Sequence, residues 1–415
     1  MNESLVTHRD NCRVCGSRSL NKLFDLGDMP LAGSFLSSEM SINDEKKFPL
    51  SVYYCEDCTL VQVLDVINPD YLFKNYNYES SVIPSLNNHF IEYSKFIKKR
   101  FAEIENLKIL EFGSNDGVFL KEFSSNDAFC LGVDPSLNVS KKAKEKGINI
   151  FNDYFNAESS RKIVEKYGHF DIVTGSNVLA HMDDVHTVVR AAKNVLRSSG
   201  VIIVEVHYLP DLINLNQYDT IYHEHLSYYT LRSLVELFRI HDMSVIDALK
   251  IDSHGGSIRV VASVDNKQKK SPNVKNILSE ESGIDLEYFN NFAQNVESQR
   301  NEIVTILKEL KKNGKKIVGY GAAGRGTIFL NYCGIGNDIL DYIVDSSKLR
   351  IGKLMPGVHV PIKDICKLKE DEKKPDYILI IAWNYSDSII EQARTLLNKN
   401  LKFIIPFPRV TIVSD

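Results

Sequence analysis

The sequence predicts an α/β protein made of three regions, on two observations. From about residue 71 onward, apolar strand-like runs alternate with amphipathic helix-like segments. This alternation is typical of a parallel sheet with helices on both faces. The first 70 residues lack the pattern and hold two closely spaced cysteine pairs instead. We therefore predict domains over residues 1–70, 71–265 and 266–415.

The individual elements are predicted from runs of apolar residues and from the polar stretches between them. In the middle region the predicted strands are Lys108–Phe112, Cys130–Val133, Phe170–Gly175 and Val201–Val206, with a helix over Val118–Phe123. The polar stretch from Asp265 to Gly283 is predicted to be a linker, and one long helix is predicted over Leu286–Lys312. In the last region the predicted strands are Lys316–Tyr320, Asp341–Val344, Tyr377–Ile381 and Phe403–Ile405.

Composition excludes several classes of protein. The 415 residues carry a net charge of only −4, with lysines scattered along the chain. A nucleic-acid-binding protein usually has a concentrated basic surface, so we expect no nucleic-acid partner. No apolar run reaches the ~18 residues of a membrane span, and the polar start lacks a secretory signal, so we expect no membrane association and a cytoplasmic location. Oligomeric state stays open, and a monomer is compatible with the sequence.

The cysteine pairs predict a metal centre. Cys12 and Cys15 form one C-x-x-C knuckle, and Cys55 and Cys58 form a second. Each short loop places two sulfurs on one side, and two such loops complete a tetrahedron of thiolates around Zn²⁺. All four positions are filled by cysteine, so the predicted ion is structural. The alternative is a pair of redox or unrelated free cysteines.

The glycine-rich loop of the middle region predicts a ligand crevice. Glu111 and Gly113 end the first predicted strand, and Asp134 ends the second, where an acid commonly grips a ribose diol. Polar residues follow the next two strands, and in a parallel sheet all these ends meet at one edge. The ordered set resembles the class I fold of S-adenosylmethionine-dependent methyltransferases. The predicted cofactor-binding residues are Glu111, Gly113, Asn115, Gly117, Asp134, Pro135, Asn152, Asp153, Ser176 and Asn177.

The C-terminal region carries a second glycine motif. Gly319, Gly321 and Gly324 form G-x-G-x-x-G after a predicted strand, and Asp345 follows the next strand. Taken alone, this spacing predicts a dinucleotide site, so a nicotinamide-dependent oxidoreductase is one alternative function. Another alternative is a scaffold that binds its ligands without turnover. Glycines needed only for close helix–strand packing are the structural alternative for the motif itself.

The cysteine pairs, the Glu-Phe-Gly-Ser-Asn-Asp-Gly loop and the run from Tyr222 to Tyr229 together resemble the sugar C-methyltransferases of deoxysugar biosynthesis. That resemblance covers essentially the whole chain. It implies a zinc-binding N-terminal domain, a class I methyltransferase domain and a C-terminal Rossmann-like domain. It also implies methyl transfer from S-adenosylmethionine to a carbon of a nucleotide-linked 4-keto sugar. Which sugar, which nucleotide and which ring carbon stay open.

The same resemblance implies roles for particular residues. The implied catalytic residues are His225, Tyr222, Glu224, His181 and Tyr76. The implied substrate-binding residues are Tyr78, Gly321, Gly324, Arg325 and Asn384. Arg325 is a departure, because lysine is more usual in this family at that position; both side chains can meet phosphate, and arginine can do so with two nitrogens.

Carbon methylation beside a ketone requires a base, because the carbon must first become an enolate. A neutral histidine suits this task near pH 7. We expect His225 to be the base, Glu224 to hold its imidazole in one tautomer, and Tyr222 or a second histidine to hydrogen-bond the enolate oxygen. His223 and His225 also admit plainer interpretations, as surface histidines or as a metal site.

Overall fold

The computed structural model describes residues 5–37, 42–73, 81, 84–123, 127–253, 255–397 and 401–414. The chain folds into two compact units, each assembled from several segments. Unit 1 comprises Met1–Asn21, Tyr54–Pro210 and Leu226–Ile284, and unit 2 comprises Lys22–Tyr53, Asp211–His225 and Asp285–Asp415. The three predicted domain boundaries stay a prediction.

Unit 1 contains a seven-stranded sheet of order β12-β13-β10-β9-β6-β7-β8. The five strands from β6 to β10 are parallel, whereas β13 and β12 are antiparallel additions at one edge. The strands are β6 (Lys108–Phe112), β7 (Phe129–Val133), β8 (Ile150–Phe151), β9 (Phe170–Ser176), β10 (Leu196–His207), β12 (Ser244–Ile251) and β13 (Ser257–Ser263). Because the strands β6 to β9 are parallel, their carboxyl ends share one edge, as the sequence predicts.

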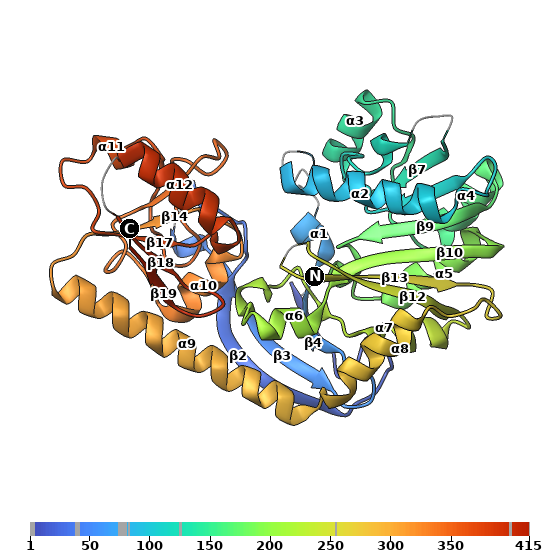
Figure 1. Ribbon diagram of the computed structural model, residues 1–415, viewed down its shortest axis with the longest axis horizontal. Helices are drawn as coiled ribbons and strands as arrows, with labels where there is room; N and C mark the ends of the chain where they lie inside the picture. Colours follow the sequence, from blue (N-terminus) through green and yellow to red (C-terminus); the bar gives the residue numbers. More distant parts are fainter. Residues whose placement is uncertain are drawn as a thin grey trace. The chain divides into compact units, whose positions relative to one another are not determined.

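Apolar residues on both faces of this sheet explain the layers that cover it. In β6, Leu110 and Phe112 belong to a core shared with Ile163 of α4, whereas Ile109 belongs to a second core with Tyr93 of α2. Successive strand residues point to opposite faces, so one strand supplies both cores. The helices of unit 1 are α1 (Pro69–Phe73), α2 (Pro84–Arg100), α3 (Leu137–Glu145), α4 (Ala157–Tyr167), α5 (Val185–Val195), α7 (Leu231–Ile240) and α8 (Pro272–Glu280), labelled in Figure 1.

Two of the sequence predictions for unit 1 are wrong. The predicted linker contains helix α8, which Ser271 caps through a hydrogen bond to the Asn273 N–H and Pro272 opens. Its buried Val274 and Ile277 are spaced as one helix face, a short signal that the surrounding polar residues hide. The predicted helix over Val118–Phe123 is only a 3-10 turn, Leu120–Glu122.

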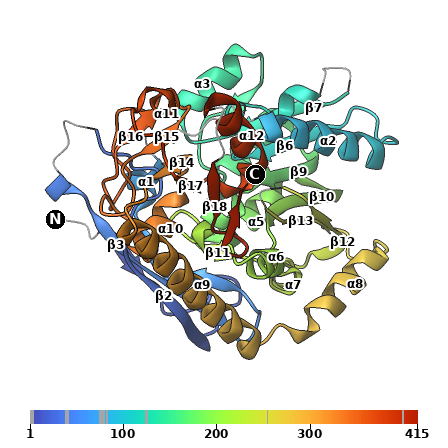
Figure 2. The ribbon, with the colours of Figure 1, turned by 60° about the vertical axis from the view of Figure 1, so that its left-hand side comes forward.

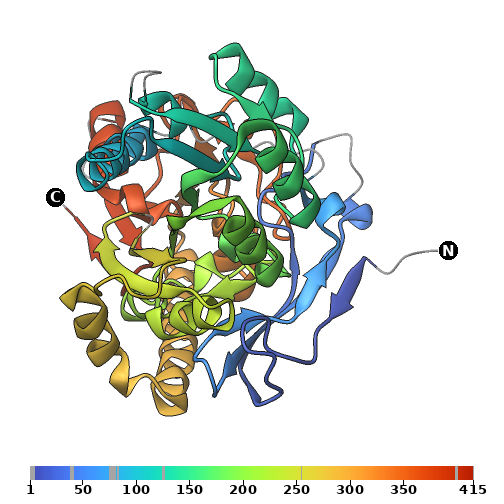
Figure 3. The ribbon, with the colours of Figure 1, turned by 90° about the vertical axis from the view of Figure 1, so that its right-hand side faces the viewer.

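The strands in the sheets beside the cysteine pairs range from two to eleven residues in length. They are β1 (Val6–His8), β2 (Leu20–Pro30), β3 (Lys47–Cys55), β4 (Val61–Val63), β5 (Asp65–Ile67) and β11 (Ser227–Tyr228). Strands β2 and β3 are neighbours in one sheet and appear as the long blue pair in Figures 1 and 3. They occupy much of the chain between the two cysteine knuckles. Strand β11 pairs antiparallel with β4.

Unit 2 contains a six-stranded sheet of order β16-β15-β14-β17-β18-β19, in which only β19 is antiparallel to its neighbour. The long helix α9 (Leu286–Lys312) has the predicted bounds and is continuous in Figure 2. The remaining elements are β14 (Ile317–Tyr320), β15 (Ile343–Asp345), β16 (Ile362–Asp364), β17 (Tyr377–Ile380), β18 (Lys402–Ile405), β19 (Thr411–Val413), α10 (Gly326–Cys333), α11 (Lys367–Glu370) and α12 (Ser386–Leu397), with the short α6 (Leu209–Asn214) earlier in the chain. None of the helices in the described ranges is long and apolar enough to cross a membrane.

Candidate functional site

The four predicted zinc ligands come together in unit 1. The Sγ atoms of Cys12, Cys15, Cys55 and Cys58 all lie within 4.8 Å of one another. Each knuckle closes with a backbone hydrogen bond, from the Gly16 N–H to the Cys12 carbonyl and from the Thr59 N–H to the Cys55 carbonyl. Among the described residues this is the only group of His, Cys, Asp and Glu side chains arranged to hold a metal ion. Four thiolates leave no open position, which fits a structural Zn²⁺.

The glycine loop after β6 is shaped by a close approach and by an acid. Gly113 has a φ of +64°, and a Cβ there would lie 2.5 Å from Val178, so this position requires glycine. The Asp134 carboxylate accepts hydrogen bonds from the Asn115 N–H and the Ser136 N–H, both at 2.9 Å. Burial raises the pKa of Asp134, and the two N–H donors offset part of that effect. The acid is therefore held at the carboxyl end of β7, where the sequence predicts it.

Glu111, beside this loop, has a carboxylate with unmet bonding capacity. The residue is 4% exposed, and its buried Oε2 has no hydrogen-bond partner in the described part of the chain. Burial raises the pKa of Glu111 well above its usual value, and the nearby Asp134 and Glu205 carboxylates raise it further. A buried acid in this condition is stabilised by a cationic ligand. S-adenosylmethionine carries an ammonium and a sulfonium group, so these residues fit it.

The other predicted cofactor-binding residues differ in their hydrogen bonding and in their burial. The Asn152 amide donates to the Asp134 carbonyl at 2.7 Å, so it supports the acid's loop. Asn177 has a φ of +55°, and its buried Oδ1 has no hydrogen-bond partner among the described residues. Of the remaining residues, Gly117 is buried and Pro135 exposed, both in loops at the same edge. Asp153, in the loop after β8, and Ser176, the last residue of β9, are half-buried.

Around His225, unit 2 forms a compact hydrogen-bonded cluster. The Nδ1 atom of His225 lies 3.1 Å from the Thr220 carbonyl oxygen, and Nε2 lies 2.9 Å from the Tyr222 hydroxyl. The two rings lie with centroids 4.1 Å apart, so Tyr222 packs on the imidazole as well as bonding to it. A carbonyl can only accept, so Nδ1 carries the proton and the lone pair of the neutral ring is on Nε2. A backbone carbonyl therefore fixes the tautomer of His225, whereas the sequence predicts that Glu224 does so.

The neighbours of His225 divide into different roles. Burial raises the pKa of Glu224 from its usual 4.5 to about 7. His223 is buried, and its Nε2 donates to the Phe48 carbonyl at 3.1 Å, which gives it a structural partner. His181 ends a 3-10 helix, Leu179–His181, in unit 1. Its role stays a prediction, and the predicted Tyr76 and Tyr78 lie outside the described residues.

The C-terminal glycine loop leads into a preorganised arginine. Arg325 is 16% exposed, its Nε lies 3.5 Å from the Asp219 carboxylate, and its guanidinium lies 4.6 Å from the centre of the Trp383 ring. Trp383 itself donates to Asp219 at 2.8 Å. Gly321 has a φ of +88° and packs against Ala382. Gly324 lies close to the Ala32 carbonyl, and Asn384 is exposed.

Comparison with known protein families divides the chain into three consecutive parts. Residues 12–73 match a zinc binding domain, residues 88–248 a methyltransferase domain, and residues 252–408 a C-methyltransferase C-terminal domain. The C-methyltransferase NovU of Streptomyces niveus is 34% identical over 418 residues, which cover 99% of each chain. The chain belongs to the C-methyltransferase family. As a family member it is an S-adenosylmethionine-dependent enzyme with a zinc-binding N-terminal domain, which favours the predicted transferase over the oxidoreductase and scaffold alternatives.

More distant relatives match a smaller part of this C-methyltransferase. A ubiquinone biosynthesis O-methyltransferase of Colwellia psychrerythraea is 29% identical over 101 residues, covering 23% of this chain and 40% of that protein. A solved S-adenosylmethionine-dependent methyltransferase of Clostridium acetobutylicum is 12% identical, covers 42% of this chain and 91% of its own, and superimposes with a TM-score of 0.34.

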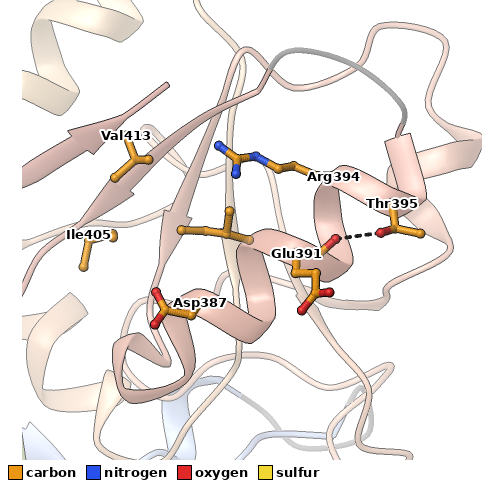
Figure 4. Close-up of a pocket in the computed structure, with 7 residues that line it drawn as sticks. Asp387, Glu391, Arg394, Thr395, Ile405 and Val413 are labelled. Carbon is orange, nitrogen blue, oxygen red and sulfur yellow. Dashed lines mark hydrogen bonds between the residues drawn. The ribbon is translucent and has the colours of Figure 1, made fainter. Parts of the chain in front are cut away.

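One surface hollow in unit 2 is unrelated to these residues. Figure 4 shows it between α12 and the last two strands, where Asp387, Glu391 and Arg394 surround an apolar floor that includes Ile405 and Val413. The Thr395 hydroxyl donates back to the Glu391 carbonyl along the helix. None of the predicted site residues lines this hollow.

Sequence reasoning missed two buried residues that support the site. Asp219 is 0% exposed and receives both Trp383 and Arg325. Arg13, inside the first cysteine knuckle, is 1% exposed and donates to the Val63 and Leu226 carbonyls. In sequence an acid in a polar loop and an arginine in a knuckle both resemble solvated residues, and only the long-range contacts distinguish them.

Proposed function

We propose that this enzyme transfers a methyl group to a carbon next to the ketone of a nucleotide-linked 4-keto-(deoxy)sugar, with His225 as the base. The observation that carries the proposal is the hydrogen bond between Nδ1 of His225 and the Thr220 carbonyl. It leaves Nε2 as the basic atom of a neutral imidazole, the form suited to taking a proton from carbon near pH 7.

The reaction begins with the hydrogen bond between the Tyr222 hydroxyl and Nε2 of His225. When the sugar enters, the Tyr222 hydroxyl turns from Nε2 to the ketone oxygen, and Nε2 is freed to remove the proton from the adjacent carbon. The electron pair of that C–H bond becomes the enolate, whose oxygen Tyr222 stabilises by hydrogen bonding. S-adenosylmethionine, when bound, supplies the electrophilic methyl group on its sulfonium. The enolate carbon would take this methyl group, so that the C–C bond forms as the S–CH3 bond breaks and S-adenosylhomocysteine leaves with that electron pair. The ketone is restored, and His225 later returns its proton to solvent.

For the nucleotide, we propose that Arg325 binds the diphosphate. Its planar face packs on the Trp383 ring and its Nε lies 3.5 Å from the Asp219 carboxylate, so the guanidinium is partly restricted before a ligand arrives. A restricted guanidinium loses less side-chain freedom when it binds phosphate with its two terminal nitrogens. The N–H groups of the Gly321–Gly324 loop and the exposed Asn384 are the neighbouring contacts that we propose for the same ligand.

Deuterium exchange tests the base separately from methyl transfer. With S-adenosylhomocysteine in place of the methyl donor, the enzyme in deuterated water should exchange the proton beside the ketone. His225→Asn should abolish that exchange and slow methylation by the ~10²–10⁴-fold typical of a general base, while both ligands still bind. Tyr222→Phe is the matched variant, because it removes the hydroxyl and keeps the ring.

The outcomes separate the alternatives. A near wild-type rate for His225→Asn with an inactive Tyr222→Phe would reverse the two roles. Normal turnover by both variants would show that the Tyr222–His225 cluster is structural. Binding of both ligands by the wild type with neither exchange nor methylation would instead identify a scaffold.

A further inference from the structure

Asp219 is a buried acid that the reaction itself does not use. It lies in the 3-10 helix Tyr218–Thr220 and is fully buried. Burying a carboxylate is costly unless it is paired and hydrogen-bonded. Its Oδ2 accepts a hydrogen bond from the Trp383 indole at 2.8 Å and lies 3.5 Å from Nε of Arg325. Its buried Oδ1 has no hydrogen-bond partner among the described residues, and burial raises the pKa of Asp219 while the nearby Arg325 lowers it. Arg325 is therefore the cation that favours the charged form of this acid.

Asp219 is followed in the chain by Thr220, the residue that orients His225. The Thr220 carbonyl accepts a hydrogen bond from Nδ1 of His225 at 3.1 Å. The short segment is anchored by the aromatic ring of Tyr218, which packs against Phe407 with centroids 5.1 Å apart. The Asp219 side chain contacts Arg325, and the carbonyl of the next residue, Thr220, contacts His225, so this short segment links the two within unit 2.

One bond in this series is looser than the others. The 3.5 Å separation between Arg325 and Asp219 exceeds the 2.7–2.9 Å typical of a charge-assisted hydrogen bond, whereas the Trp383 bond has an ordinary length. An anion on the terminal nitrogens of Arg325 would fix the guanidinium against Asp219. Fixing Asp219 also fixes the Thr220 carbonyl, and with it the direction of the His225 ring.

We infer that Asp219 is a positioning residue that couples anion binding at Arg325 to the alignment of His225. The inference rests on the proposed function and deepens it. Binding energy from the diphosphate, a part of the substrate that does not react, is used to align the base at the reacting carbon. A substrate without its diphosphate should therefore lose turnover rate as well as affinity.

A substrate supplied in two pieces tests this coupling. The first piece is a 4-keto sugar lacking its nucleotide, and the second is inorganic pyrophosphate. The rate measured is deuterium exchange beside the ketone, with S-adenosylhomocysteine bound. In the wild type, saturating pyrophosphate should accelerate exchange by at least tenfold.

The decisive variant is Asp219→Asn, which keeps the shape and an acceptor for Trp383 but removes the charge. It should bind pyrophosphate in calorimetry as tightly as the wild type, or more tightly, because Arg325 is no longer neutralised. The acceleration should nevertheless be lost. On the whole substrate, kcat should fall more than KM rises. Asp341→Asn is the matched control, because Asp341 is exposed and pairs only with Lys311 among the described residues; it should keep the acceleration.

A second variant covers the case in which Asp219→Asn does not fold. Arg325→Lys keeps a positive charge for pyrophosphate but lacks the fork that meets phosphate and Asp219 together, so binding should survive and acceleration should not. Equal acceleration in Asp219→Asn and the wild type, or no acceleration in the wild type, would overturn the coupling. Failure of the proposed function looks different, because the wild type would then exchange no proton on any intact nucleotide-linked keto-sugar.

Discussion

Replacing Glu224 with glutamine should make the protein more stable at pH 8 and leave its stability almost unchanged near pH 4.5. Burial raises the pKa of Glu224 from 4.5 to about 7, because the charged carboxylate loses its hydration. Among the described residues, loss of hydration is the one cause of this shift, and no neighbouring charge opposes it. Glutamine has nearly the same shape and cannot ionise.

The sign and size of the effect follow from proton linkage. Between pH 4.5 and pH 7 the folded protein keeps this proton while the unfolded chain has lost it, so stability falls as the pH rises through that window. Below the window the two states bind the proton equally, and above it the loss is complete. At about 1.36 kcal/mol per unit, the rise from 4.5 to about 7 corresponds to at most ~3 kcal/mol, and the half-buried position of the side chain reduces this through solvent screening. Glu224→Gln should recover up to that amount above pH 7.

The assay is denaturant unfolding at pH 5 and pH 8, followed by tryptophan fluorescence. Trp383 is the only tryptophan in the sequence and lies in the same unit as Glu224, so the signal reports on the relevant transition. Tyr222→Phe is the control, because it alters the same cluster and leaves the carboxyl in place; its stability should depend on pH as the wild type's does. A stability gain for Glu224→Gln that is equal at both pH values would refute the reasoning.

Three further perturbations test the zinc centre, the cofactor acid and the knuckle arginine. Cys55→Ser should lose the single equivalent of zinc measured by metal analysis and unfold the N-terminal module, because ion binding supplies much of the folding energy of such sites; a stable, zinc-loaded variant would contradict the assignment. Asp134→Ala should weaken S-adenosylmethionine binding in calorimetry by roughly 1.5–3 kcal/mol, the scale of a hydrogen bond to a charged group, and unchanged affinity would remove Asp134 from the ribose site. Arg13→Met should lower the free energy of unfolding by at least about 1.5–3 kcal/mol, because two buried carbonyls lose a charged donor, whereas Arg18→Gln at an exposed position should not.

The fold was largely predictable because its strands are continuous apolar runs. The predicted strand Lys108–Phe112 matches β6, and the helix Leu286–Lys312 matches α9. Runs buried on both faces carry a strong local signal. Helix α8 was missed because only Val274 and Ile277 of it are fully buried, so polar neighbours dominate the pattern.

The site was predictable to the extent that its chemistry is written in short motifs. The cysteine knuckles and the acid after β7 are local features, and the structure forms both arrangements. The partner of Nδ1 in His225 was not predictable, because any backbone carbonyl can accept and none leaves a trace in the sequence. The Asp219–Trp383 bond joins residues 164 positions apart, so it depends on the tertiary fold alone.

The two glycine loops share one backbone arrangement, but the side chains beside them carry opposite charges. After β6, the Gly113 N–H donates to the Val133 carbonyl of β7, and Asp134 accepts the N–H groups of Asn115 and Ser136. After β14, the Gly321 N–H donates to the Val344 carbonyl of β15, and Asp345 accepts the N–H groups of Ala322 and Ser347. The difference lies in what surrounds this frame. Glu111 adds a buried carboxylate in unit 1, whereas Gly319 occupies the corresponding place before the loop in unit 2, and Arg325 adds a cation behind that loop. The first arrangement therefore suits the cationic sulfonium methyl donor, and the cation beside the second supports the diphosphate site proposed for Arg325.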